Sequence, residues 1–331
     1  MPAATSQEFL FRRVKELLPP QVSLVDKIAS ILHLSSDSAY RRIRGETPLV
    51  LEEARELCDY FNLSLDQILH VSGGSTLFES VRVSEKGYNY RAFLQDLLNE
   101  VRRVTNFMQR EIIYRTKDMP VFHNFYFEPL IAFRYFFWMK TIIQDPAFRD
   151  SEFSPDCVPA DIVETSLEIS RVYNTLPSTE IWNTECINAA ISQVEFYKDS
   201  GMFSSAKEIR LVYEALEHTV EHIRTMAEFG TKFMPGENPE TRKDNFRLFY
   251  NRVVLGDNTV MVITDRAKTV FLNYDGLNYL FTRDATFCDP CYDDLQNLMK
   301  RSTLISQTSE KQRNIFFGVM LSKIADRKKH L

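Results

Sequence analysis

The sequence is poor in glycine and proline, with 10 and 13 of these residues in a chain of 331. Long disordered or low-complexity segments are usually rich in them, so none is expected here. The five cysteines are scattered and odd in number, which argues against a disulfide framework. We therefore expect a reducing compartment and a cytoplasmic protein.

Long apolar runs are also missing. The most apolar segment, residues 121–139, contains His123, Glu128 and Arg134, which are unfavourable in a bilayer. Residues 1–12 lack the basic start and apolar run of a signal peptide. We expect no membrane partner, and we interpret the apolar segment as a buried helix.

The motifs of common enzyme classes are absent. The sequence has no glycine-rich phosphate loop, no GxSxG nucleophile elbow and no dinucleotide-binding fingerprint. We therefore expect neither an enzyme nor a cofactor. The formal net charge of −5 excludes a chain that is basic throughout, but a local basic patch can still bind nucleic acid.

Five short helices are predicted in the first seventy residues. Apolar spacing, serines that can cap helices and terminal glycine or proline set their limits. The expected helices cover residues 8–18, 24–32, 37–44 and 51–61, with a short fifth from residue 64. Ser23 and Asp26 have the spacing of a capping box, and Gly45 ends the third helix.

The third helix carries most of the local positive charge. Tyr40 and Ile43 lie three residues apart, and we expect both to face the core. The remaining polar residues then fall on or near the outer side. They are Asp37, Ser38, Arg41, Arg42 and Arg44.

This order of elements resembles the Cro/repressor-like (XRE) helix-turn-helix family over residues 6–70. The string IASILHLSSDSAYRRIRGETPLVLEEARELCDYFNLSLDQIL, residues 28–69, carries the resemblance. Its telling features are the Ile-Ala pair, the serine at the turn, the Arg-Gly after the third helix and the closing Asn-Leu-Ser-Leu-Asp. Where the family often has glutamine near the start of the second helix, this chain has Leu24 and Val25.

The resemblance implies a sequence-specific transcriptional regulator whose third helix reads an operator in double-stranded DNA. Arginine on such a helix can make paired hydrogen bonds to guanine, and neighbouring cations hold phosphates. The residues expected at the DNA are Ser36, Asp37, Ser38, Arg41, Arg42, Arg44, Lys27, Arg12 and Arg13.

An alternative is a protein-interaction module whose helix-turn-helix domain docks another protein. The acidic balance of the chain favours this interpretation, whereas Arg41, Arg42 and Arg44 are evidence against it. Under the first reading we expect a homodimer, because one small helix-turn-helix domain rarely binds tightly alone.

The sequence beyond residue 70 predicts a mainly α protein with three further parts. Residues 71–80 form a linker around Val-Ser-Gly-Gly-Ser, residues 81–235 a helical sensory or dimerisation domain, and residues 236–331 a small α+β module with an antiparallel meander. Helices are expected over residues 90–114, 127–143, 159–175, 178–198, 204–229, 290–301 and 310–328. Strands are expected over residues 246–254, 259–264, 269–274 and 277–282, with turns at 256–258 and 265–266.

The aromatic helix over residues 127–143 is apolar almost all round and must be buried. A domain core, a dimer interface and an aromatic-lined pocket are the alternatives, and we predict that part of it lies at or near a dimer contact. In a pocket, His123, Asn124 and Arg134 could orient an apolar or amphipathic small molecule, or a peptide, as effector.

Two further patterns carry weak chemical signals. His218, Glu221 and His222 have the HxxEH form of one metalloprotease class, and Cys288 and Cys291 form a CxxC pattern near a helix start. The two histidines and two cysteines are candidate zinc ligands, and the cysteines alone a candidate redox switch. We expect the two histidines to lie opposite the apolar stripe of their helix and to point to water, and ordinary packing is the interpretation that we favour for the cysteines.

Overall fold

The computed structural model describes residues 5–18, 22–61, 63–69, 76–81, 89–239, 244–253, 256–275 and 278–331. The chain divides into two compact units, residues 1–77 (unit 1) and residues 78–331 (unit 2), which are described separately. The predicted linker sequence at residues 71–75 lies outside the described residues. None of the helices within these ranges is long and apolar enough to span a bilayer.

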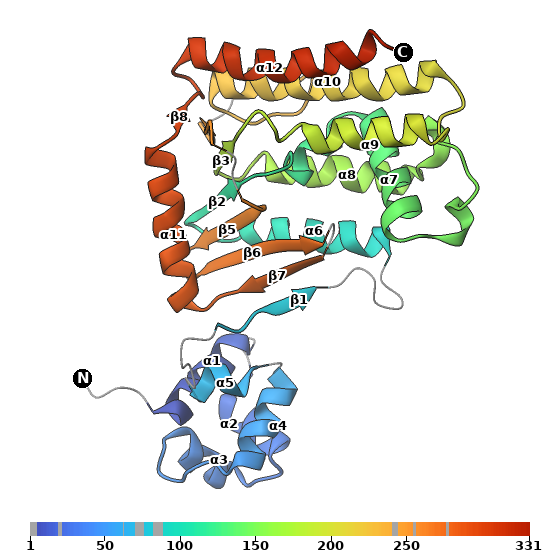
Figure 1. Cartoon of the computed structure of the whole chain (residues 1–331). Helices are drawn as coiled ribbons and strands as arrows, with labels where there is room; N and C mark the ends of the chain where they lie inside the picture. The colour runs from blue at the N-terminus through green and yellow to red at the C-terminus, as the bar shows by residue number, and fades with distance from the viewer. Residues whose placement is uncertain are drawn as a thin grey trace. The chain divides into compact units, whose positions relative to one another are not determined.

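Unit 1 is a bundle of five short helices (Figure 1). They are α1 Ser6–Leu17, α2 Leu24–Ile31, α3 Ser36–Ile43, α4 Leu51–Phe61 and α5 Leu65–Leu69. The predicted helical N-terminal domain is therefore confirmed. Leu10, Val14, Ile28 and Leu57 are fully buried at its centre, and each such side chain contributes about 1.5–3 kcal/mol relative to exposure.

The caps of α1 and α2 explain where these helices begin. Thr5 Oγ1 accepts a hydrogen bond from Glu8 N at 3.2 Å, and the Glu8 carboxylate accepts one from Thr5 N at 2.8 Å. This reciprocal pair is a complete capping box, which the sequence analysis did not identify. At the predicted box, Ser23 Oγ accepts from Asp26 N at 3.3 Å.

Unit 2 is built on an eight-stranded mixed sheet with the order β1-β7-β6-β5-β2-β3-β4-β8. Its strands are β1 Glu79–Val81, β2 Arg110–Arg115, β3 Ser178–Trp182, β4 Phe246–Tyr250, β5 Thr259–Thr264, β6 Lys268–Asp275, β7 Asn278–Thr282 and β8 Thr303–Leu304. Strands β2, β3 and β4 run parallel to one another, and the other neighbouring pairs are antiparallel.

The helices of unit 2 cover the two faces of this sheet unequally (Figure 1). They are α6 Tyr90–Thr105, α7 Glu128–Phe137, α8 Ala160–Tyr173, α9 Asn188–Asp199, α10 Ala206–Phe229, α11 Ala285–Lys300 and α12 Glu310–Lys328. Three short 3-10 helices, η1 Val121–Phe125, η3 Pro146–Phe148 and η4 Pro155–Cys157, and one π-helical turn, η2 Trp138–Ile142, connect them. Among the described helices of unit 2, α11 is the one that packs on one face, against Ile113, Ile181 and Met261. The alternating residues Ile112 and Trp182 face the opposite helical layer.

The sheet overturns the predicted fold class for this part of the chain. We predicted a helical region followed by a separate small C-terminal meander, and this prediction is wrong. Strands β2 and β3 come from the predicted helical region, yet they lie in the same sheet as the later strands. Strands β5, β6 and β7 do form an antiparallel meander. The expected hairpin across residues 256–258 is absent, since β4 pairs with β3 and β8 while β5 pairs with β2 and β6.

The two central strands were mistaken for helix. The predicted helix over residues 90–114 ends at Thr105 and is followed by β2, and the predicted helix over residues 178–198 begins as β3. All five residues of β3 are buried. A strand buried on both faces shows no polar–apolar alternation, so its periodicity does not distinguish it from a buried helix.

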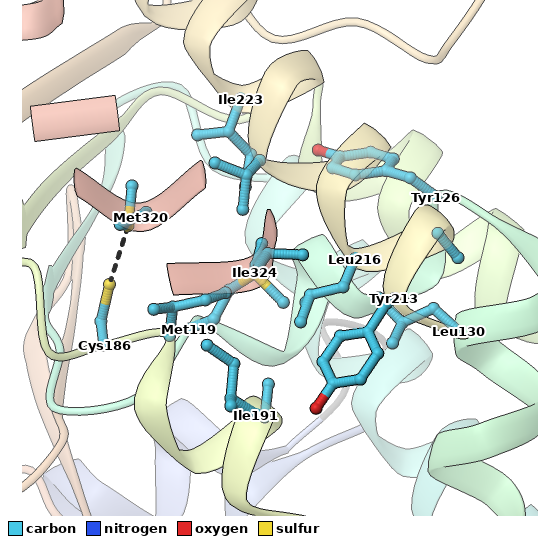
Figure 2. Packing of buried hydrophobic residues seen from close by; sticks show 14 of the residues in the cluster. Met119, Tyr126, Leu130, Cys186, Ile191, Tyr213, Leu216, Ile223, Met320 and Ile324 are labelled. Atoms are coloured by element: carbon cyan, nitrogen blue, oxygen red, sulfur yellow. Dashed lines mark hydrogen bonds between the residues drawn. The ribbon is translucent and has the colours of Figure 1, made fainter. Parts of the chain in front are cut away.

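The largest core cluster lies between α7, α9, α10, α12 and the sheet (Figure 2). Tyr213, Leu216 and Ile223 of α10 pack with Met320 and Ile324 of α12. The Cys186 thiol approaches the Met320 sulfur at 3.8 Å. Helix α7 is part of this core, and seven of its residues are buried within the same chain. Its apolar character therefore needs no partner chain.

A network of buried polar side chains, here called the Glu180 network, lies between β3 and the helical layer. The Glu180 carboxylate accepts hydrogen bonds from Tyr173 Oη at 2.6 Å and Trp182 Nε1 at 2.8 Å. His123 Nε2 lies 3.0 Å from both of its oxygens. Burial raises the pKa of Glu180, but the His123 charge and these hydrogen bonds outweigh it, and the net pKa is lowered.

Lys232 extends the Glu180 network. Its Nζ donates to Ser178 Oγ at 2.7 Å and lies 3.6 Å from the centre of the Tyr173 ring. Burial lowers the pKa of Lys232 to about 7, against the opposing influence of Glu180. Three ionisable side chains are thus fully enclosed, and Glu180 interacts with both of the others.

Candidate DNA-binding surface

Helix α3 is fixed at both ends by local interactions. Ser35 caps its start, with Oγ accepting from Ser38 N at 3.2 Å. Gly45 follows its end in the left-handed region at φ 75°, as predicted. The turn before α3 contains His33 at φ 53°, where histidine is among the side chains that tolerate this conformation. The helix-turn-helix geometry is therefore fixed by the local sequence.

The rotation of α3 differs from the predicted one. Ala39 is fully buried and supplies the contact with the core, whereas Tyr40 is 46% exposed. We expected Tyr40 to face the core, and that prediction is wrong. A side chain as small as alanine brings the backbone of α3 close to its neighbours, which leaves no room there for an aromatic ring.

The outer face of α3 carries Tyr40, Arg41 and Arg44. The Arg44 guanidinium lies 5.6 Å from the centre of the Tyr40 ring, and its Nη1 donates to the Tyr40 hydroxyl at 3.3 Å. Arg41 is paired with Asp37 at 3.2 Å, and both side chains are largely exposed. Exposed pairs of this kind are worth little and exchange readily for another anion.

Arg42 has a different role from its two neighbours. Its Nε and Nη2 donate to both oxygens of Glu53 on α4, at 2.8–3.1 Å, and its side chain is only 17% exposed. The hydrogen bond from Arg42 is the main cause that lowers the pKa of Glu53. Glu53 also accepts from Val50 N at 3.2 Å, which helps to begin α4. The structure therefore does not bring Arg42 to the outer face with Arg41 and Arg44.

Gln7 of α1 is a positioning residue that the sequence analysis missed. Its Nε2 donates to Arg42 O at 2.7 Å and Thr47 O at 2.8 Å, and its Oε1 accepts from Leu49 N at 3.0 Å. One amide thus holds the end of α3 and the segment that leads to α4. Nothing in the sequence pattern singles it out, because these three bonds depend on tertiary contacts.

The other predicted contact residues are distributed over unit 1. Ser36 and Asp37 are exposed in the first turn of α3, and Ser38 Oγ lies 3.0 Å from Ser35 Oγ within the cap. Lys27 of α2 lies over the Tyr60 ring at 4.4 Å. On α1, Arg12 lies over the Phe9 ring at 5.5 Å and Arg13 pairs with Glu16 at 2.7 Å.

The predicted zinc candidates do not meet. His218 and His222 lie on α10 in the helical layer, whereas Cys288 and Cys291 lie on α11 at the opposite face of the sheet. Within the described part of the chain, no group of three or more metal-ligating side chains occurs. Burial raises the pKa of Cys288 to about 11, opposite to the activation by a helix start that the CxxC pattern indicated.

His222 is a packing residue, so the expectation that it points to water is wrong, because its ring is partly buried against other aromatic side chains. Its Nε2 lies 2.8 Å from Phe233 O, which can only accept, so this nitrogen donates. The ring packs edge-on against Tyr126 and Phe233. Burial lowers the pKa of His222 to about 4, so it is neutral at pH 7. His218, one turn earlier, is exposed.

The polar residues expected to orient an effector separate into two groups. Asn124 and Arg134 line a cavity in unit 2, whereas His123 is fully buried in the Glu180 network.

Comparison with known families agrees with the assignment of unit 1. Residues 8–81 match the BetR domain, a helix-turn-helix type of DNA-binding domain found in transcription regulators. No curated protein and no solved structure matches the chain. The BetR match assigns a DNA-binding regulatory role to the N-terminal part of the protein.

Proposed function

We propose that the protein is a sequence-specific transcriptional regulator that places α3 in the major groove of operator DNA, in the manner of the Cro/repressor-like family. The observation that carries this proposal is the outer face of α3. Arg41, Arg44 and Tyr40 are exposed together there, while Ala39 on the opposite side anchors the helix in the core.

The chemistry of this face suits base recognition. A guanidinium offers two parallel N–H donors that match the O6 and N7 acceptors of guanine. The competing carboxylates, Asp37 and Glu46, form only exposed pairs with Arg41 and Arg44. DNA phosphates and base edges can replace these pairs with small loss, because solvent already screens them.

A homodimer is the second part of the proposal. A single small module buries little DNA surface and binds with modest affinity, whereas a two-fold dimer engages two half-sites at once. The acidic balance of the chain strengthens this requirement, since non-specific attraction to DNA is correspondingly small. In this proposal, the contact between the two protomers lies in unit 2.

The test is selection of a binding site by the full chain from a random duplex pool. We expect an enriched two-fold symmetric site with half-sites about 10 base pairs apart, or a multiple of that distance. Its affinity should exceed that of a scrambled duplex at least about 1,000-fold at physiological salt. No enrichment, with weak binding that disappears as salt is raised, would overturn the proposal and favour a protein-docking module.

A further inference from the structure

Unit 2 contains a partly open cavity of about 460 Å³ between α6, α7, α9 and the sheet. Its walls are mainly aromatic and aliphatic, with Phe93, Tyr114, Trp138 and Val262 among them. Small-molecule sites generally have volumes of about 300–1,000 Å³ and mostly apolar walls with a few polar groups. This cavity is therefore large enough for a small ligand of mainly apolar character.

Arg134 is the positively charged side chain that lines this cavity. Its Nε donates to Asn124 Oδ1 at 3.0 Å and its Nη1 donates to Gln193 Oε1. In the described part of unit 2, this guanidinium forms no ion pair with a carboxylate, and its hydrogen bonds use Nε and Nη1. Two neutral amides thus orient the arginine without neutralising it.

Two acidic side chains also line the cavity, and neither neutralises Arg134. Glu100 pairs with Arg103 at 2.8 Å. Asp118 is hydrogen-bonded to Asn258, and the charges of Lys117 and Arg134 both act on it without a direct ion pair. Burial is the main influence on Asp118 and raises its pKa. Among the described residues, neither carboxylate forms a direct ion pair with the guanidinium of Arg134.

We propose that this cavity binds an amphipathic carboxylate, with its carboxylate on Arg134 and its apolar body between α6 and the sheet. A charge that has lost much of its hydration is costly unless an opposite charge pairs with it. A carboxylate matches the fork of N–H donors on arginine better than any neutral group does.

The electrostatics of Arg134 support this assignment. Burial lowers its pKa to about 10, and the nearby Tyr90 and Asp118 oppose that effect only in part. A bound carboxylate would supply the direct ion pair that Asp118 does not form with Arg134. The site belongs to unit 2 alone, so ligand binding there does not depend on DNA binding by unit 1.

The first experiment measures binding of a ligand series to the full wild-type chain by calorimetry. The probes are decanoate, decanol and methyl decanoate, which share one apolar body and differ in the head group. We expect the acid to bind about tenfold or more tightly than the other two, because only it forms a charge-assisted pair. Phenylpropionate and its alcohol form a second arm, which distinguishes a fatty-acid ligand from an aromatic acid.

Variants then locate the site. Arg134→Gln should remove the preference for the acid, and Ala189→Phe should weaken all probes by filling the cavity. Arg102→Gln is the matched control, since Arg102 is a largely exposed arginine of α6 and is not in the cavity wall.

The wild-type series decides the matter even if Arg134→Gln does not fold. Equal affinity for acid, alcohol and ester would overturn the role of Arg134. No binding of any probe in either arm would overturn the site itself. A preference for the acid that survives in folded Arg134→Gln would contradict the assigned position.

Discussion

The two units place their polar groups in opposite ways. In unit 1, the fully buried residues among those described are apolar, and the structural hydrogen bonds of Gln7 and Arg42 lie at the edge of the core. In unit 2, Glu180, His123 and Lys232 are completely enclosed. The core of unit 1 is therefore stabilised by apolar packing, and the polar side of α3 remains exposed, where DNA can bind in the proposed function. Unit 2 depends on satisfied polar contacts in its interior.

The largest expected effect of this difference is at Glu180. Glu180→Leu leaves His123, Tyr173 and Trp182 with buried donors and no acceptor, which should cost unit 2 about 3–5 kcal/mol. Hydrogen exchange measured by mass spectrometry reads each unit separately. Exchange should accelerate throughout unit 2 and stay unchanged in unit 1.

Glu221→Leu is the control for that substitution, because Glu221 is exposed on α10. Wild-type protection of unit 2 in Glu180→Leu would show that the buried network contributes little.

The second-largest difference between the units is expected in how their stability depends on pH. His222 has a folded pKa of about 4 against 6.5 for an ordinary histidine. As the pH falls through this window, the unfolded state takes up a proton that the folded state refuses. Unit 2 should lose stability between pH 6.5 and 4, by an amount on the order of 2–3 kcal/mol. Chemical denaturation of the full chain at a series of pH values measures this loss.

His222→Gln should flatten that dependence, since the amide can still donate to Phe233 O and does not titrate. His218→Gln, one turn earlier and exposed, should leave it as in wild type. A steep loss in the same window in both variants would assign the effect to another group.

Two glycines sharpen the comparison at a smaller scale. Gly45 after α3 and Gly230 after α10 both have positive φ, at 75° and 67°. A methyl group at Gly45 meets open space, whereas one at Gly230 would overlap the Gln307 side chain. Gly45→Ala should cost about 1 kcal/mol from backbone strain alone, and Gly230→Ala about 1–2 kcal/mol more. Equal losses in denaturant melts would mean that Gln307 moves aside freely.

The same contrast explains which parts of the fold were predictable. Helices of unit 1 carry their own signals, such as Ser35 before α3 and Gly45 after it, and local sequence sets their limits. Strands β4, β5, β6 and β7 are also predicted from the sequence, because turn residues punctuate that part of the chain. The central strands β2 and β3 carry no such signal, since their pairing partners lie more than sixty residues away along the chain.

In the candidate sites too, local sequence predicts some features, and tertiary packing determines the others. The position of Arg41 and Arg44 on the outer face follows from helical periodicity. That Arg42 turns toward Glu53, and that Gln7 holds the next segment, depends on packing between helices that no local pattern encodes. Glu180 was missed for a similar reason, because a single acidic residue in a short strand gives no indication of burial.

The most direct test of the account compares two pairs of substitutions in unit 1. Arg41→Ala and Arg44→Ala remove the outer face of α3, whereas Arg42→Ala and Glu53→Gln break the internal pair. Affinity for the selected duplex and thermal stability are measured for each full-length variant.

We expect Arg41→Ala and Arg44→Ala each to bind the duplex about tenfold or more weakly, with unchanged stability. Glu53→Gln should lower stability, on the order of 1–2 kcal/mol, and keep wild-type affinity at temperatures where it is folded. Wild-type affinity in a folded double variant lacking both Arg41 and Arg44 would contradict the claim that this face of α3 reads DNA.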